Sequence, residues 1–153
     1  MGGGRGGIGG PLYGDPIAAS PTDPHPDREA VLAANDSFYA AFEGRDMDAM
    51  SAVWEHSDRV SCVHPGWNVL RGWGAVAGSW FALFGGPQHL QFILTNHEAA
   101  VDGDIAWVTV DENLLDADQA AATVTSLNLF ARGADGTWRM IAHHSTPVAP
   151  TVG

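Results

Sequence analysis

The spacing of hydrophobic positions predicts three helices in the first half of the chain. Steps of three and four residues predict a first helix over residues 27–44, with Gly44 as its stop, because glycine accepts the left-handed conformation found at helix ends. Its stripe consists of Val31, Asn35, Phe38, Tyr39 and Phe42. Asp46 is a favourable N-cap for a second, shorter helix whose apolar side carries Met47, Met50 and Trp54. A third helix is predicted over residues 72–84.

A strand over residues 59–64 precedes that third helix, and beyond Pro87 the hydrophobic period changes to two. This alternation predicts four long strands over residues 88–101, 105–115, 121–132 and 137–146. Glycine-containing turns separate them, so consecutive strands form an antiparallel meander. The order of helices and strands predicts an α+β fold in one domain over residues 27–148, without an internal repeat.

Both ends of the chain differ in composition from this domain. Eight of the 19 glycines and five of the nine prolines fall within residues 1–26, which have little apolar surface to offset the entropy of ordering. We expect residues 1–26 to be a flexible tail and residues 149–153 a short C-terminal tail. The first segment has no apolar core typical of a signal peptide.

Charge and cysteine content limit the classes of partner and location. The chain has a net charge of −11 and no lysine, which argues against nucleic acid and anionic membrane partners. No apolar run approaches the roughly 20 residues that a membrane-spanning helix needs. The single cysteine, Cys62, lies in an apolar run and is interpreted as a small buried side chain, which fits the reducing cytoplasm.

Three segments in this order resemble the nuclear transport factor 2-like superfamily, in particular its SnoaL-like and ketosteroid-isomerase-like branch. The segments are residues 38–50 (FYAAFEGRDMDAM), 71–76 (RGWGAV) and 136–145 (GTWRMIAHHS). The resemblance implies a curved antiparallel sheet wrapped around the N-terminal helices, enclosing a cone-shaped apolar cavity. It also implies a homodimer that pairs through the outer face of the sheet.

His64 is the sharpest candidate for catalysis. The resemblance aligns His64-Pro65 with the catalytic Asp-Pro of ketosteroid isomerases, and imidazole can accept a proton near neutral pH. The alternative is a histidine that only hydrogen-bonds the backbone at its turn. The same alignment puts Phe38 at the position of the isomerase tyrosine, with Tyr39 adjacent, and Leu127 near the position of its acid. Asn128, beside Leu127, is a candidate to polarise an oxygen in place of that acid.

Glu112 interrupts the apolar row of Ala106, Val108, Val110 and Leu114. A carboxylate on such a row is costly unless it is paired or functional, so Glu112 either lines the cavity mouth as an acid or base, or lies where the strand has left the core. These two interpretations remain equal.

Adjacent strand residues point to opposite faces, so only one of His143 and His144 enters the cavity. The row Trp138, Met140, Ala142 favours His144 as the inward, catalytic candidate, although a β-bulge would reverse this. His56, His89 and His97 are interpreted as surface or interface residues. The spacing of the histidines does not match a zinc site, and neither a metal nor another cofactor is expected.

The remaining cavity candidates are mainly aromatic. Trp67 follows a turn without a periodic partner and is placed to cover the mouth of the cavity. Asn96 follows Phe92 and Leu94 on an apolar row, which predicts a polar cavity group. The full set of predicted pocket residues is Tyr39, Trp54, Trp67, Trp80, Phe84 and Asn96.

Two functions follow from these candidates. The first is a SnoaL-like enzyme that uses acid/base chemistry on a small hydrophobic molecule, as an isomerase, cyclase or dehydratase, with His64, Glu112, Asn128 and His144 as catalytic candidates. The second is a non-catalytic ligand-binding or dimerisation module, which the missing isomerase tyrosine and acid favour. The residues alone do not choose between them.

Overall fold

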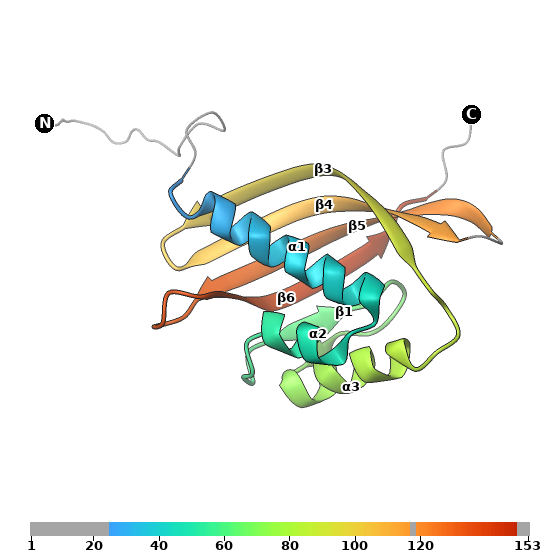
Figure 1. Cartoon of the computed structure of the whole chain (residues 1–153), viewed down its shortest axis with the longest axis horizontal. Helices are drawn as coiled ribbons and strands as arrows, with labels where there is room; N and C mark the ends of the chain where they lie inside the picture. The colour runs from blue at the N-terminus through green and yellow to red at the C-terminus, as the bar shows by residue number, and fades with distance from the viewer. Residues whose placement is uncertain (1–24, 117–118, 150–153) are drawn as a thin grey trace, which may run out of the picture.

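The computed structural model describes residues 25–116 and 119–149 and has three helices and six strands (Figure 1). The helices are α1 (Arg28–Gly44), α2 (Met47–Val53) and α3 (Trp73–Phe84). The strands are β1 (Ser61–Val63), β2 (Leu70–Arg71), β3 (Gln91–Asp102), β4 (Ile105–Asp116), β5 (Gln119–Arg132) and β6 (Trp138–Pro147). The predicted N-terminal tail lies almost wholly outside the described residues, as do residues 150–153 of the C-terminal one.

The six strands form one sheet in the order β2-β1-β6-β5-β4-β3. The four long strands are the predicted antiparallel meander, and the α+β class is confirmed. Two features go beyond the prediction: the short strand β2, and the parallel pairing of β1 with β6, which places Cys62 opposite His143. This pairing places β1, the first strand in the chain, beside β6, the last.

Helix α1 crosses the inner face of the sheet (Figure 1), and its apolar stripe belongs to the hydrophobic core. Val31, Asn35, Phe38 and Tyr39 on this stripe are buried, as the periodicity predicted. The stop differs from the prediction, because Arg45 and not Gly44 adopts the left-handed conformation, with φ 50°. Asp46 caps α2 as predicted, since its Oδ1 accepts a hydrogen bond from the backbone N–H of Ala49 at 3.0 Å.

The hydrophobic core lies between α1 and the sheet, where large side chains are fully buried. Its largest members are Trp54, Trp80, Phe38, Phe130, Met50 and Met140. Phe38 and Phe42 meet Trp80 edge-to-face, with ring centroids 5.6 and 4.8 Å apart. These contacts hold α3 against the C-terminal half of α1.

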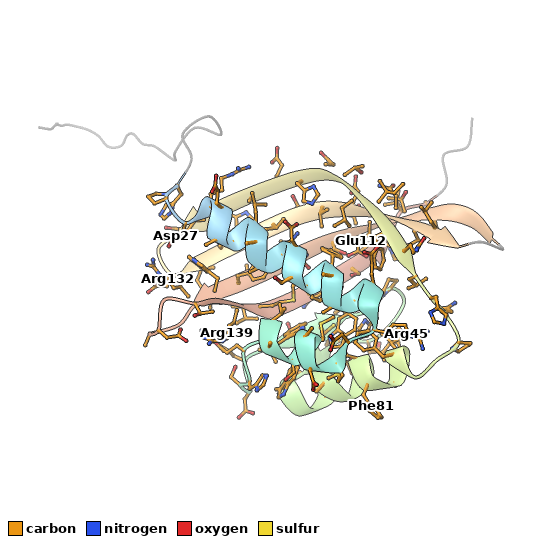
Figure 2. The ribbon with its side chains drawn as sticks, viewed as in Figure 1. Asp27, Arg45, Phe81, Glu112, Arg132 and Arg139 are labelled. Carbon is orange, nitrogen blue, oxygen red and sulfur yellow. The ribbon has the colours of Figure 1, made fainter. Side chains whose placement is uncertain are left out.

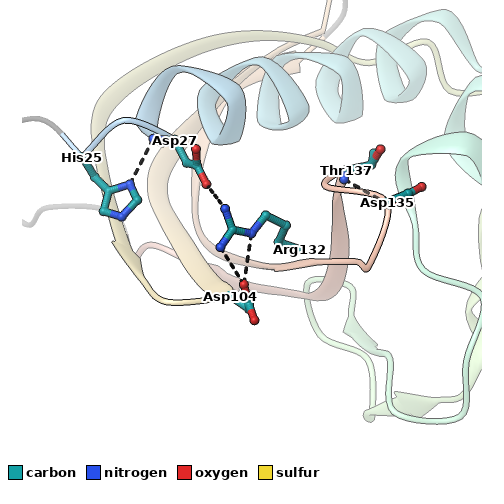
Figure 3. Close-up of polar contacts among 6 residues, drawn as sticks. All are labelled: His25, Asp27, Asp104, Arg132, Asp135 and Thr137. Atoms are coloured by element: carbon teal, nitrogen blue, oxygen red, sulfur yellow. Dashed lines mark hydrogen bonds and ion pairs between the residues drawn. The ribbon is translucent and has the colours of Figure 1, made fainter.

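One arginine fastens the opposite end of α1 to the sheet. Arg132, at the end of β5, contacts Asp27 at 2.6 Å and Asp104 at 2.7 Å (Figure 3). Asp27 precedes α1, and Asp104 lies in the turn between β3 and β4. The two ion pairs therefore join three segments at the end of the molecule that is farther from the site described next.

Candidate functional site

A cavity of about 310 Å³ opens at the C-terminal end of α1, between α3 and the inner faces of β3 to β6. Most of its wall is apolar, with Phe42, Leu83, Phe84, Leu90, Phe92 and Leu114. Its polar lining consists of Arg45, His64, Gln88, Glu112, His143 and Ser145. A mostly apolar wall with a few convergent polar groups is typical of small-molecule sites.

Glu112 faces this cavity from β4, behind the C-terminal half of α1 (Figure 2). Only 3% of the residue is exposed, so the alternative of a solvated Glu112 is wrong. Its Oε2 accepts hydrogen bonds from the Tyr39 hydroxyl at 2.5 Å and the Ser126 hydroxyl at 2.6 Å. Among the described residues, Oε1 has no hydrogen-bond partner. Burial raises the pKa of the Glu112 carboxyl, because the charged form loses its water.

His64 lines the cavity directly after β1, at the first position of the turn His64-Pro65-Gly66-Trp67. The N–H of Trp67 donates to the His64 carbonyl at 2.8 Å, and Gly66 has the positive φ (83°) that a type II turn needs. Pro65 and Gly66 thus favour this turn, and the turn sets the position of the His64 side chain.

The protonation of the His64 ring follows from its partner Ser79, whose hydroxyl donates to the Val76 carbonyl at 2.7 Å. Since that proton is used, His64 Nε2 must carry the hydrogen of its 2.9 Å contact with Ser79 Oγ. Nδ1 is then the unprotonated nitrogen. Burial lowers the pKa of His64 to about 4, so the ring is neutral at pH 7.

His143, and not His144, points into the cavity, which corrects the prediction from alternation. Leu129 pairs with Ala142 but Phe130 pairs with Met140, so Ile141 is an extra residue in β6. This bulge exchanges the two faces of the strand, and His143 is 1% exposed. His144 lies on the other face, where it contacts Ser61 Oγ at 2.9 Å.

Two hydrogen bonds fix the His143 ring. Its Nδ1 lies 2.6 Å from Asn128 Oδ1, and its Nε2 lies 2.9 Å from Ser145 Oγ. Burial, followed by the nearby His64 and His144, lowers the pKa of His143 to about 3. The ring is therefore neutral and able both to donate and to accept.

Asn128 and Tyr39 do not line the cavity, contrary to the prediction of Tyr39 as a pocket residue and of Asn128 as a group that polarises a ligand oxygen; both are buried behind the cavity wall. The Asn128 amide donates to Asn35 Oδ1 at 2.8 Å and to the Tyr39 hydroxyl at 3.1 Å. Burial and the neighbouring Glu112 raise the pKa of Tyr39. Asn128 thus positions Tyr39 and His143, while Leu127 points outward and is exposed.

The predicted aromatic pocket residues divide into two groups. Trp67 and Phe84 line the cavity, whereas Trp54 and Trp80 are fully buried in the core beside it. Trp80 still touches the site, since its ring meets the His64 ring edge-to-face with centroids 4.7 Å apart.

Asn96 does not enter the cavity, contrary to prediction. It has φ 60° and lies in a β-bulge, where Asn96 and His97 together oppose a single residue of β4. Its exposed side chain lies 3.4 Å from Asp111 on the outer face of the sheet. As in β6, one inserted residue interrupts the alternation on which the prediction rested.

Arg45 is a cavity residue that the sequence did not indicate. Its guanidinium donates to the backbone carbonyls of Phe84, Gly86 and Gln88 at 2.5 to 3.1 Å. These hydrogen bonds satisfy carbonyl groups at the C-terminus of α3 and in the segment leading to β3 (Figure 2). Arginine directly after a helix stop was the available signal, but its three acceptors come from residues about 40 positions later.

Cys62 is a buried free cysteine, and burial raises its thiol pKa to about 12, as expected of a packing residue. Among residues 25–116 and 119–149, no three His, Cys, Asp or Glu side chains are grouped to hold a metal ion. No helix in the described part of the chain is both long and apolar enough to cross a membrane.

A curved sheet closed over one long helix, with a cavity at one end, defines the nuclear transport factor 2-like class of α+β proteins. The chain belongs to the SnoaL-like domain family, whose model matches residues 31–150.

Two solved structures illustrate the range of this class. A protein of the NTF2-like family from Streptomyces avermitilis, proposed to be a dehydratase, is 38% identical; the match covers 81% of this chain and 97% of that one, with a TM-score of 0.74. A Thiobacillus denitrificans protein, proposed to be a calcium/calmodulin-dependent protein kinase type II association domain, is 37% identical over 77% and 94% of the two chains, with a TM-score of 0.71.

A curated relative, F-box protein SKIP8 of Arabidopsis thaliana, is 29% identical over 117 residues. The match covers 76% of this chain and 49% of that protein, so the chain spans about half the length of its relative.

Proposed function

We propose that this protein is a SnoaL-like enzyme that uses acid/base chemistry on a small apolar molecule bound in the cavity. The reaction would be an isomerisation, cyclisation or dehydration, each of which needs one proton donor and one proton acceptor. The observation that carries the proposal is Glu112, a buried carboxyl group in a mostly apolar wall, with Oε1 unused by the described residues. Such a group is costly to keep unless it is paired or functional, and its free Oε1 favours a function on a ligand.

Glu112 is the proposed acid, because burial raises the pKa of its carboxyl group and so favours the protonated form. His64 is the proposed acceptor, since the contact with Ser79 leaves Nδ1 unprotonated. Asn128 acts as a positioning residue through Tyr39 and His143. The chemistry uses only side chains of this chain, and exclusion of water by the apolar wall strengthens their hydrogen bonds to a ligand.

The test is turnover of a panel of small polyketide, terpenoid and steroid ketones and alcohols, together with any ligand extracted from the purified protein. Glu112→Gln should lower turnover by about 10²–10⁴-fold, the usual contribution of a positioned acid or base. His64→Ala should lower it as well. Asp111→Asn, next to Glu112 but on the outer face, is the matched control. Undiminished turnover in Glu112→Gln would remove Glu112 from the mechanism.

A non-catalytic dimerisation module is the second candidate, and the outer face of the sheet favours it. Trp107 and Leu127 are 38% and 41% exposed there, and the Thiobacillus denitrificans relative carries the name of an association domain. We propose a homodimer through this face. Sedimentation should give a dimer that Leu127→Glu dissociates; a dimer without turnover of any ketone or alcohol would favour this candidate over the enzyme.

A location in the reducing cytoplasm also remains a proposal, and the free, buried Cys62 supports it.

A further inference from the structure

Six buried side chains beside the cavity close into a ring of hydrogen bonds. In order around the hydrogen-bond ring they are Tyr39, Glu112, Ser126, Ser145, His143 and Asn128. The six contacts measure 2.5, 2.6, 2.9, 2.9, 2.6 and 3.1 Å. None of the six residues is more than 4% exposed. Glu112, His143 and Ser145 also line the cavity, whereas the other three lie behind its wall.

Three strands, β4, β5 and β6, contribute side chains to the ring, and backbone pairing holds these strands in register. Ser126 is the direct cross-strand partner of Ser145, and Asn128 is the partner of His143. Glu112 reaches Ser126 diagonally from β4, and Tyr39 closes the ring from α1. The spacing between neighbours is thus set by the sheet and not by flexible side chains.

Counting hydrogens shows that the ring is one short when Glu112 is ionised. Tyr39, Ser126 and Ser145 each bring one hydrogen, and neutral His143 brings one. Asn128 contributes one hydrogen in either orientation of its amide, because the ring meets its nitrogen on one side and its oxygen on the other. Five hydrogens cannot fill six contacts, so two lone pairs would face each other in a buried site.

We propose that the ring takes up the missing proton as the carboxylic acid of Glu112, and that the cavity therefore presents a neutral acid to an uncharged ligand with a carbonyl or hydroxyl oxygen. The use of this acid in turnover rests on the proposed function, whereas its protonation does not. The proton that completes the ring lies on Oε2, in a contact with Ser126 or Tyr39, so the turnover step moves it from Oε2 to the ligand oxygen; the ring is then again one hydrogen short, and the carboxylate formed keeps Tyr39 and Ser126 as donors.

The surroundings favour the carboxyl group as the holder of this proton. An imidazolium at His143 would also complete the ring, after hops from Glu112 to Ser126, Ser145 and Nε2 that conserve the number of protons. Burial opposes that state, because it raises the pKa of Glu112 and lowers that of His143. The other titratable groups near the ring are His64, whose pKa is also lowered, Cys62, whose raised pKa keeps it a neutral thiol, His144 on the outer face, and Arg45, whose N–H groups donate to backbone carbonyls.

Infrared spectroscopy of the ligand-free protein at neutral pH tests this proposal. The wild type should have the carbonyl stretching band of a protonated carboxylic acid, and glutamate labelled with ¹³C should shift it. Glu112→Gln should abolish the band, while Asp111→Asn should retain it. Absence of the band in the wild type would overturn the proposal.

Ser145→Ala provides a second test that does not alter Glu112. This change removes two contacts and one hydrogen, so four contacts remain for four hydrogens with Glu112 ionised. The acid band should therefore be lost at neutral pH and return only at lower pH. Ser61→Ala, which removes a hydroxyl contact to His144 on the outer face, is the control and should leave the band unchanged.

A band that persists in Ser145→Ala at its wild-type pH range would show that the ring does not hold the proton. The spectra need no substrate, which separates the two proposals. An acid band without any turnover contradicts the enzyme but supports the ring, and turnover without the band does the reverse.

Discussion

The two halves of the sheet's inner face are built from the same strands but differ in chemistry. Towards the N-terminus of α1, the inward residues are apolar, namely Ala106, Val108, Phe130 and Met140. Towards its C-terminus the same strands carry Glu112, Ser126, His143 and Ser145. The first half is filled and the second encloses the cavity, so packing and chemistry are separated along one face.

This separation explains how the fold tolerates a buried carboxyl group and two buried histidines. Apolar burial in the filled half supplies the stabilisation, and the polar half needs only to satisfy its own hydrogen bonds. The predictions below test whether the halves are as independent as this division implies.

The largest effect is expected in the filled half. Phe130→Ala should lower the free energy of unfolding by about 3–5 kcal/mol, because it removes a fully buried ring and leaves a void. Phe92→Ala should cost clearly less, since Phe92 is half-buried and already borders the cavity. Urea unfolding measures both, and equal losses would contradict the division into two halves.

Acid should weaken the polar half next. His64 and His143 have folded-state pKa values of about 4 and about 3, below the ordinary 6.5, so the stability they contribute is present above pH 6.5. It should be lost as the pH falls from 6.5 towards those values, at up to about 1.4 kcal/mol per pH unit for each histidine. His64→Gln should remove the part of this pH dependence that His64 contributes, and an unchanged slope in that variant would contradict a lowered pKa of His64.

Glu112 should act in the opposite direction at higher pH. Because its folded pKa is raised, its contribution is full below pH 4.5 and is lost as the pH rises through the folded value. Unfolding of Glu112→Gln should therefore depend less on pH above 4.5 than unfolding of the wild type. An identical slope above pH 4.5 in the two proteins would contradict a raised pKa.

Substitutions of Arg45 should change the free energy of unfolding by a smaller amount, and two of them separate the cost of its backbone conformation from the contribution of its side-chain hydrogen bonds. Arg45→Ala and Arg45→Gly both remove the hydrogen bonds to the end of α3, but only glycine relieves the left-handed φ of 50°. Arg45→Gly should thus be more stable than Arg45→Ala by about 1–2 kcal/mol in chemical denaturation. A less stable glycine variant would mean that this conformation carries no cost.

The smallest effect is expected at Arg132, in the half far from the cavity. Its ion pairs with Asp27 and Asp104 are exposed, so Arg132→Met should lower the melting temperature slightly at low salt and not at high salt. A large decrease that persists at high salt would indicate that this clamp, and not the apolar packing, holds the filled half together.

Periodicity in the sequence was sufficient for the elements but not for their long-range pairing. The change from a period of 3.6 to 2 at Pro87 places α3 and β3 correctly, and Asp46 identifies the start of α2. Strand β2 is too short to have a period, and the pairing of Cys62 with His143 joins residues about 80 positions apart. No local pattern carries that information.

The candidate site was predictable where a residue breaks its own pattern. Glu112 stands out on an apolar row, and His64 ends a strand at a Pro-Gly turn. Ser126 and Ser145 do not stand out, because a small polar residue is common on either face of a strand. Asn96 and His144 were assigned to the wrong face because alternation assumes a strand without bulges.

The extra residue Ile141 changes which residues of the last strand face inward. Before it, even-numbered residues form the inner surface; after it, odd-numbered residues do. Deletion of this one residue would leave Met140, His143 and Ser145 inward in regular alternation, whereas moving the extra residue to a position beyond Ser145 would turn His143 and Ser145 outward, with every side chain retained. The chemical identity of this cavity is thus encoded in the place of one inserted residue as much as in the composition of the strand.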